Sequence, residues 1–334
     1  MQAGGPTRTA RLRLISLLVG VPLLALGGLD RALVDWRAQW VWAAREVPPL
    51  VFDPYRLEAL LRTTPPGRAN VLLLGNSVVE MGFDSAALER RFADRGLRFP
   101  KLTLGGAPAL SFGMLADAIA ELEPSLAVYV VTAPGLRSRG YLEDVHVYDA
   151  RAVPELFTAS EVLAEPAYHI DGAVGQANIL ARHRNALQRA ALVRLGFTSW
   201  DALRPRADLA QLRKMLSGDN AWQSWVAERE PDTYPNPNTR ALARLARKLR
   251  AAGARLLVIE APMHPAQARL TPRVRIATQR AEVARLAAQE GFELIPASML
   301  PALDEADFSD WIHASARGRE RLTAFLGDTL ARAL

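Results

Sequence analysis

The 334-residue sequence contains no cysteine, only five histidines, and lysine at three positions alone. Without cysteine there can be no disulfide bond, thiolate metal site or cysteine nucleophile, although the redox compartment stays open. The net charge is +6 and is carried almost entirely by arginine. This excess reflects either a codon bias or a basic surface that attracts anionic lipid or polymer. No basic run is interleaved with aromatic residues, so we predict no nucleic-acid partner.

Several motifs that carry chemistry are also missing. No G-x-G-x-x-G and no phosphate-binding loop follows the first apolar strand. There is no H-E-x-x-H motif, and the scattered histidines do not indicate zinc. An acidic cluster at Asp304, Glu305 and Asp307 is interpreted as a solvated loop rather than a cation site. We therefore predict no metal and no organic cofactor.

The N-terminal segment carries a short membrane signal. Three arginines precede an uncharged apolar run over residues 14–29. This run is slightly short for a membrane span, which needs about 20 residues. It is longer than a signal-peptide core of about 7–15 residues. We favour an uncleaved single-pass anchor in the inner (cytoplasmic) membrane, with the arginines in the cytoplasm and the rest on the periplasmic or extracellular side.

The chain after this run divides into two further parts. Residues 1–30 are the predicted anchor, and residues 31–69 form a juxtamembrane helical segment. Its tryptophans at positions 36, 40 and 42 lie either at the lipid headgroups or against the domain. Residues 70–334 form the predicted main domain.

Apolar strands and helical segments alternate along this domain. The sequence predicts strands over residues 71–75, 101–106, 126–134, 254–262 and 292–298, with helices over 84–96, 111–122, 273–290 and the C-terminal residues. Such alternation predicts a three-layer α/β/α domain with a mainly parallel sheet. Between about 136 and 240 the pattern breaks, and we interpret this stretch as a helical insertion.

The stretch "VLLLGNS" ends its first strand by presenting Ser77 after Gly75 and Asn76. Ligands of open parallel sheets bind beyond the carboxyl ends of the strands. A turn here, with a helix that starts near Asp84, would leave the Ser77 hydroxyl at the sheet edge. Two interpretations follow: a nucleophile, or a serine that only satisfies backbone groups in the turn.

A nucleophilic serine needs a base, and that base needs an orienting carboxylate. Among the histidines, His313 follows Asp310 by three positions, a spacing that puts both on one face of a helical turn. His264 follows a predicted strand and could reach the same sheet edge. His169 is expected in a loop.

These motifs together resemble the SGNH, or GDSL-type, hydrolase superfamily. "LLLGNSVVEMG" resembles the family's first block, in which Gly-Asp-Ser follows the first strand, and "DWIH" resembles its last block, Asp-x-x-His before the final helix. "VIEAPMHP" and "DFSDWIHASARGRERLTAFL" look closest to membrane-anchored envelope members, such as proteins of alginate O-acetylation and teichoic-acid alanylation. The resemblance covers about 70–135 and 254–334.

The resemblance implies a role for each matching residue. Ser77 would be the nucleophile, His313 the general base and Asp310 its orienting acid. Gly105 or Gly106 falls where the family's second block has its oxyanion glycine. A glycine suits this role because it lets a substrate approach its backbone N–H closely.

Two departures from the family pattern concern the substrate contacts. Asn76 replaces an acid, and Asn can still make local turn hydrogen bonds. The family's third block usually supplies an Asn to the oxyanion, whereas "VTAPGLRSRG" contains none. Arg137 or a backbone N–H would have to replace it. We predict substrate-binding roles for Asn76, Arg137 and His264.

The sequence thus predicts a membrane-anchored, extracytoplasmic serine acyl esterase or O-acyltransferase. Its substrate would be an acyl ester of an envelope or exported polysaccharide, as the resemblance implies. Two alternatives remain open: a non-catalytic partner of a membrane acyltransferase, and an esterase directed at lipid.

Overall fold

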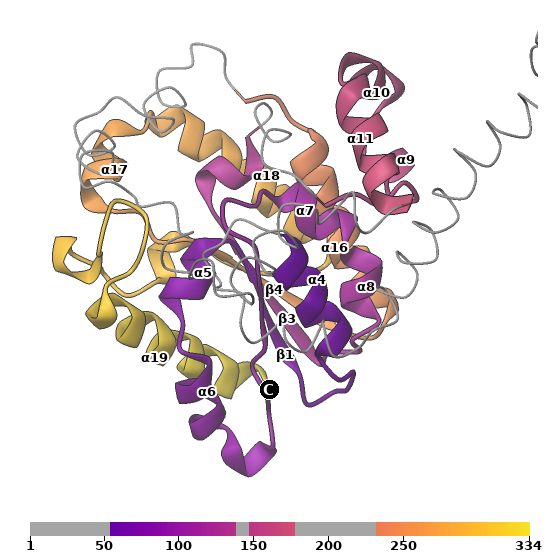
Figure 1. The fold of residues 1–334 in the computed structure, drawn as a ribbon. Helices are drawn as coiled ribbons and strands as arrows, with labels where there is room; N and C mark the ends of the chain where they lie inside the picture. The colour runs from indigo at the N-terminus through magenta and orange to yellow at the C-terminus, as the bar shows by residue number, and fades with distance from the viewer. Residues whose placement is uncertain (1–53, 138–146, 178–231) are drawn as a thin grey trace, which may run out of the picture.

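The computed structural model describes residues 54–137, 147–177 and 232–334, and within them a five-stranded sheet lies at the centre (Figure 1). All four strand pairings are parallel, and the strand order is β2-β1-β3-β4-β5. The strands are β1 (Val71–Gly75), β2 (Lys101–Thr103), β3 (Leu126–Val131), β4 (Arg255–Glu260) and β5 (Glu293–Ile295). The predicted parallel sheet is confirmed, and its order is that of flavodoxin-like doubly wound folds.

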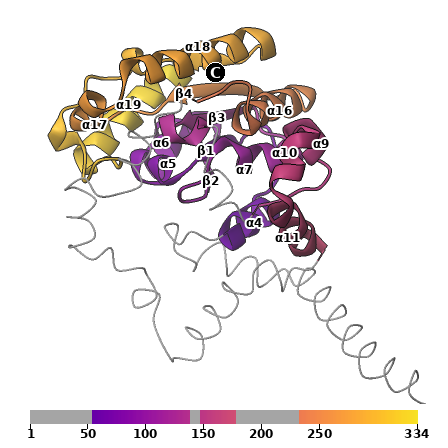
Figure 2. The ribbon, with the colours of Figure 1, turned by 90° about the horizontal axis from the view of Figure 1, so that it is seen from above.

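Helices cover both faces of this sheet. The helices are α4 (Pro54–Thr63), α5 (Ser77–Gly82), α6 (Ser85–Arg91), α7 (Ala109–Met114), α8 (Ala116–Ala120), α9 (Val153–Leu156), α10 (Ala159–Ala164), α11 (Pro166–Ala177), α16 (Pro237–Ala251), α17 (Pro265–Leu270), α18 (Arg273–Glu290) and α19 (Ala316–Ala333). Helices α5, α6 and α19 lie on one side of the sheet, with α7 and α16 on the other (Figure 2). The predicted three layers are therefore present.

The strand sequences explain this double covering. Strand β1 is buried at every position, as an apolar run in a parallel sheet should be. Successive side chains point to opposite faces of a strand. Leu72 and Leu74 accordingly join the core beneath α7 and α16, whereas Val71 and Leu73 join the core beneath α5 and α19.

Most strands end earlier than predicted, because turns begin at their carboxyl ends. Strand β2 stops at Thr103, and Ala107 N–H donates to Leu104 O at 3.1 Å to close a turn. Gly106 takes a φ of +67° in that turn. Strands β3, β4 and β5 likewise end before the prolines at 134, 262 and 296. The predicted helix over 111–122 begins at Ala109 and divides into α7 and α8 at Leu115.

The segment after β1 differs most from the prediction. An additional helix, α5, begins directly at Ser77, ahead of the predicted helix, which starts as α6 at Ser85 with Asp84 as its N-cap. Gly75 makes this possible with a φ of +152°, and a Cβ there would lie 2.4 Å from Val79 Cγ2. Asn76 caps the helix, since its Oδ1 accepts from Val78 N–H at 3.0 Å. An N-cap asparagine is a recognisable helix start, so this signal was present in the sequence.

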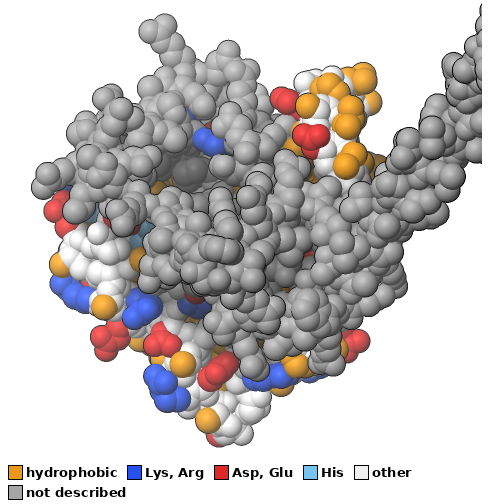
Figure 3. Space-filling view, in the orientation of Figure 1, with side chains coloured by type: hydrophobic (Ala, Val, Ile, Leu, Met, Phe, Trp, Pro, Cys, Tyr) orange, Lys and Arg blue, Asp and Glu red, His pale blue; other side chains and the backbone are white. Residues whose placement is uncertain are grey.

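The described part of the insertion is helical. Helices α10 and α11 project from the body of the domain (Figure 1) and present apolar side chains to solvent (Figure 3), with Leu163, Ile170 and Val174 exposed. The prediction of a loop around His169 is wrong. This residue lies within α11 and is buried, with Tyr148 Oη 3.1 Å from its Nδ1. Pro166 starts the helix rather than breaking it, because proline is tolerated in the first turn.

The predicted anchor over residues 14–29 lies outside the described residues. Among the helices that the structure does describe, none combines the length and apolar character that a membrane crossing requires. Helix α4, within the predicted juxtamembrane segment, packs Leu57 into the core of the domain.

Helices α7 and α16 approach so closely that only glycine fits at position 113. A Cβ there would lie 2.3 Å from Ala241 Cβ and 2.6 Å from Ala241 Cα. We expect Gly113→Ala to lower the free energy of unfolding by about 2–3 kcal/mol, because backbone must move to relieve the overlap. Urea unfolding followed by circular dichroism measures this change. Gly82→Ala is the matched control, since its Cβ would meet only Leu322 Cδ1 at 3.7 Å; equal stability of the two variants would contradict the expectation.

Candidate active site

Ser77 and His313 meet at the carboxyl edge of the sheet although 236 positions separate them. Ser77 Oγ lies 2.8 Å from His313 Nε2. Ser77 is the first residue of α5, directly beyond β1. His313 comes from the loop that precedes α19. The strand order reverses at β1, which has β2 on one side and β3 on the other, so the pair lies at the topological switch point of the fold.

Asp310 holds the imidazole of His313 from the opposite side. Its Oδ2 lies 2.7 Å from His313 Nδ1, and its Oδ1 accepts from the N–H groups of Ile312 and His313 at 2.8 Å each. Burial raises the pKa of Asp310, but the hydrogen bonds from His313 and the backbone outweigh it and hold that pKa below the usual value. An ionised Asp310 can only accept, so His313 Nδ1 carries the proton and Nε2 is left to accept from Ser77.

The loop that carries both residues is closed on itself. Phe308 and Ala314 form an antiparallel bridge, and Ser309 N–H donates to His313 O at 2.9 Å. The loop is also fastened to α19, because Asp307 pairs with Arg317 at 3.1 Å and with Arg321.

Asp307 corrects the prediction of a solvated acidic cluster. Its side chain is fully buried and ion-paired. Asp304, which is exposed, pairs with Arg317 at 2.7 Å. Arg317 and Arg321 explain why the cluster is not simply solvated. They lie one turn apart at the start of α19 and pair with these acids. Within the described ranges, no group of histidine and acidic side chains has the arrangement of a metal site.

Gly105 and Gly106 form the turn beyond β2, beside the strand that leads to Ser77. Leu104 N–H donates to Gly75 O at 3.1 Å, which fixes this turn against the end of β1. Neither glycine N–H has a hydrogen-bond acceptor among the described residues, and the same holds for Ser77 N–H. These backbone donors remain available for a bound group at the sheet edge.

Two residues that the sequence alone did not reveal join helix α5 to its neighbouring strands. Glu80, three positions after Ser77, accepts from Thr103 Oγ1 at 2.7 Å. Thr132, directly beyond β3, accepts from Asn76 Nδ2 at 3.3 Å. Both contacts depend on strand order, so sequence spacing alone does not reveal them. A start of α5 at Ser77 would have put Glu80 on the same helical face as Ser77.

A partly buried cation, Lys101, lies beside Glu80. Lys101 Nζ donates to Glu80 O at 2.6 Å, and burial lowers the pKa of Lys101. Arg56 from α4 is the second cation near this carboxylate; burial lowers its pKa too, against the opposing effect of Glu80. Lys101 and Arg56 thus place two positive charges near Glu80 of α5.

Of the residues predicted to bind substrate, His264 lies against the loop that carries Asp310 and His313. Its ring is parallel to that of Trp311, with centroids 6.2 Å apart, and edge-on to Phe308 at 5.1 Å. Its Nδ1 accepts from Ala266 N–H at 3.1 Å, so the imidazole also caps α17. The Asn76 side chain accepts a hydrogen bond from Val78 N–H and donates one to Thr132 Oγ1.

Arg137 lies five residues beyond Thr132, next to the segment that the structure does not describe. Its carbonyl accepts from Asn238 Nδ2 at 2.9 Å, and this contact fixes the backbone there against α16. The structure therefore places Arg137 on the α16 side of the β3 end. A role as an oxyanion donor stays a prediction.

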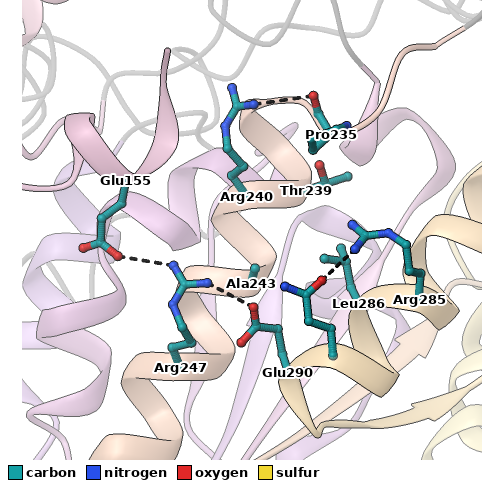
Figure 4. Close-up of a pocket in the computed structure, with 10 residues that line it drawn as sticks. Glu155, Pro235, Thr239, Arg240, Ala243, Arg247, Arg285, Leu286 and Glu290 are labelled. Carbon is teal, nitrogen blue, oxygen red and sulfur yellow. Dashed lines mark hydrogen bonds and ion pairs between the residues drawn. The ribbon is translucent and has the colours of Figure 1, made fainter. Parts of the chain in front are cut away.

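A cavity of about 330 Å³ lies away from Ser77, between α16 and α18 (Figure 4). Its charged side chains are paired either with one another or with acids outside the cavity lining. Arg247 bridges Glu155 at 3.3 Å and Glu290 at 3.1 Å. Arg285 pairs with Glu282 at 2.7 Å, and Arg240 pairs with Glu161. This pairing leaves the cavity without an uncompensated charge to attract an ionic ligand.

The similarity of this chain to known proteins is low. No protein-family model matches the sequence, and no curated protein matches it. Among solved structures, the chain is similar to one titled "Crystal Structure of TesA", at 18% identity, over 79% of this chain and 99% of that chain, with a TM-score of 0.41.

Proposed function

We propose that this chain is a serine acyl esterase or O-acyltransferase of the SGNH type. The observation that carries the proposal is the continuous relay from Ser77 Oγ through His313 to Asp310, with contacts of 2.8 and 2.7 Å. A hydroxyl becomes a nucleophile when a base within this reach takes its proton. The oriented carboxylate keeps the imidazole in the required tautomer.

The reaction would proceed in two steps. Ser77 Oγ attacks the carbonyl carbon of an ester while its proton passes to His313 Nε2. The carbonyl oxygen becomes an oxyanion, which Ser77 N–H and the N–H of Gly105 or Gly106 would stabilise. The intermediate then collapses to an acyl-enzyme, and the departing alcohol takes the proton from His313. Water or a sugar hydroxyl completes the cycle by the same route in reverse.

The proposed substrate is an acyl ester on an envelope or exported polysaccharide. The apolar run over 14–29 supports an anchor that would hold the domain at a membrane, and the resemblance to envelope members supports the polysaccharide. The inner membrane, with the domain on its periplasmic or extracellular face, is the proposed location. An ester of lipid is the alternative substrate, favoured by the tryptophans that follow the anchor.

A fluorophosphonate probe tests the proposal on the full chain in detergent. Such probes label only a serine that an adjacent base has activated. We expect covalent labelling of the wild type and none of Ser77→Ala or His313→Ala. If a folded wild type stays unlabelled, the non-catalytic partner of a membrane acyltransferase becomes the better reading.

A further inference from the structure

Thr132 contacts Asn76, the residue that precedes Ser77, at the carboxyl edge of the sheet. Strands β1 and β3 pair in register from Val71↔Leu126 to Leu74↔Tyr129. Strand β1 ends at Gly75, two residues before Ser77, and the side chain of the intervening Asn76 meets Thr132 Oγ1 at 3.3 Å. Thr132 is the first residue beyond β3 and is partly exposed. Its hydroxyl therefore belongs to the same edge as the nucleophile.

The hydrogen bond between Asn76 and Thr132 has a defined polarity. Val78 N–H can only donate, so the group that meets it at 3.0 Å is Asn76 Oδ1. The amide nitrogen of Asn76 therefore faces Thr132 Oγ1, at 3.3 Å, and the threonine oxygen accepts. The threonine proton is not used in this contact. No acceptor for it occurs in the part of the chain that the structure describes.

A glycine lies against this hydroxyl. Gly135 folds back over Thr132, and its N–H donates to Thr132 O at 2.9 Å. A Cβ at Gly135 would come within 2.9 Å of Thr132 Oγ1. The glycine thus keeps the hydroxyl uncovered on the side where a bulkier residue would press against it.

We propose that the Thr132 hydroxyl is an oxyanion donor for the acyl-transfer reaction. This inference rests on the proposed function. In the attack step, the carbonyl π-electrons move onto oxygen as the Ser77 Oγ–C bond forms, and Thr132 Oγ–H donates a hydrogen bond to that oxygen without losing its proton. It acts as a side-chain donor directly beyond β3, beside the backbone N–H groups of Ser77 and of Gly105 or Gly106.

Asn76 has a positioning role in the same arrangement. By donating to Thr132 Oγ1 it obliges the hydroxyl to turn its own proton elsewhere. An aspartate at this position would have no N–H to donate, and its second oxygen would accept the threonine proton instead. Asn76→Asp is therefore expected to remove the Thr132 donor without altering Thr132 itself.

Thr132→Val and Thr132→Ser separate the hydroxyl from the shape of the side chain. We expect Thr132→Val to lower kcat for hydrolysis of an activated acetyl ester by about 10²-fold, since one oxyanion donor is worth about that much. KM should stay within about twofold, because the contact forms only in the transition state. Thr132→Ser keeps the hydroxyl and should lose less than about fivefold. Thr329→Val, which removes a buried hydroxyl without a partner on α19, is the control with unchanged activity.

A double-mutant cycle tests the role of Asn76. Asn76→Asp should lower kcat strongly in the wild type and much less in the Thr132→Val background. Additive losses would mean that the new charge acts alone, and would overturn the positioning role. Wild-type kcat in Thr132→Val would overturn the donor, provided that Ser77→Ala is inactive in the same assay. If Ser77→Ala keeps its activity, the proposed function itself fails, and the Thr132 donor fails with it.

Discussion

Ser77→Ala is expected to lower the rate of ester hydrolysis by about 10⁴–10⁶-fold, the loss that follows removal of the nucleophile in triad hydrolases. The variant retains the fold, because Ser77 is partly exposed and its side chain bonds only His313 among the described residues. Loss of the hydroxyl leaves no group on α5 that could form an acyl-enzyme. Initial rates with an activated acetyl ester, together with a circular dichroism spectrum, measure the effect.

Ser85→Ala provides the matched control for this loss. Ser85 begins α6, eight residues later, and its buried hydroxyl has no hydrogen-bond partner. Its removal should leave the hydrolysis rate within about twofold, as expected of a site without a catalytic contact. A Ser77→Ala enzyme as active as Ser85→Ala would refute Ser77 as the nucleophile.

Asp310→Asn carries the second-largest expected loss, about 10⁴-fold in kcat. The carboxylate accepts the proton of His313 Nδ1 across 2.7 Å, and it also accepts two backbone N–H groups. An amide cannot accept at every one of these positions. If its oxygen keeps the backbone donors, its NH₂ faces Nδ1 and selects the tautomer with the proton on Nε2. That imidazole cannot take the proton of Ser77.

The pH profile distinguishes this loss of tautomer from a general loosening of the loop. Raising the pH should restore part of the activity of Asp310→Asn, because hydroxide and deprotonated serine replace the missing base. Asp304→Asn is the control; it weakens an exposed ion pair between Asp304 and Arg317 of α19 and should lower kcat by less than about threefold. Equal losses in both variants, with the same pH profile, would contradict an orienting role for Asp310.

The sequence predicted the sheet and the three residues of the relay because local patterns encode them. The run over 71–75 has no polar residue, and Asp310 and His313 lie three positions apart, so both signals are contained in a few residues. Their meeting with Ser77 depends on strand order, which the α/β alternation restricts to few topologies. The contact of 2.8 Å between distant residues agrees with that expectation in geometry; the catalytic roles stay predictions.

The remaining features depend on tertiary contacts that no short pattern contains. The contacts of Thr132 with Asn76 and of Glu80 with Thr103 exist only because β2, β1 and β3 lie side by side. Asp307 looked like a solvated acid until α19 brought two arginines against it. The proline at 166 favours a loop at His169, whereas the structure has His169 inside α11, packed against Tyr148 and Phe157.

The most direct test of the central claim is to find where an acyl group becomes attached. The full chain is mixed with an activated acetyl ester, quenched in acid within the first turnover, digested and analysed by peptide mass spectrometry. We expect one acetyl group on the peptide that contains Ser77, absent from His313→Ala treated in the same way. Turnover with the acetyl group on another residue, or with no covalent intermediate at all, would contradict the account.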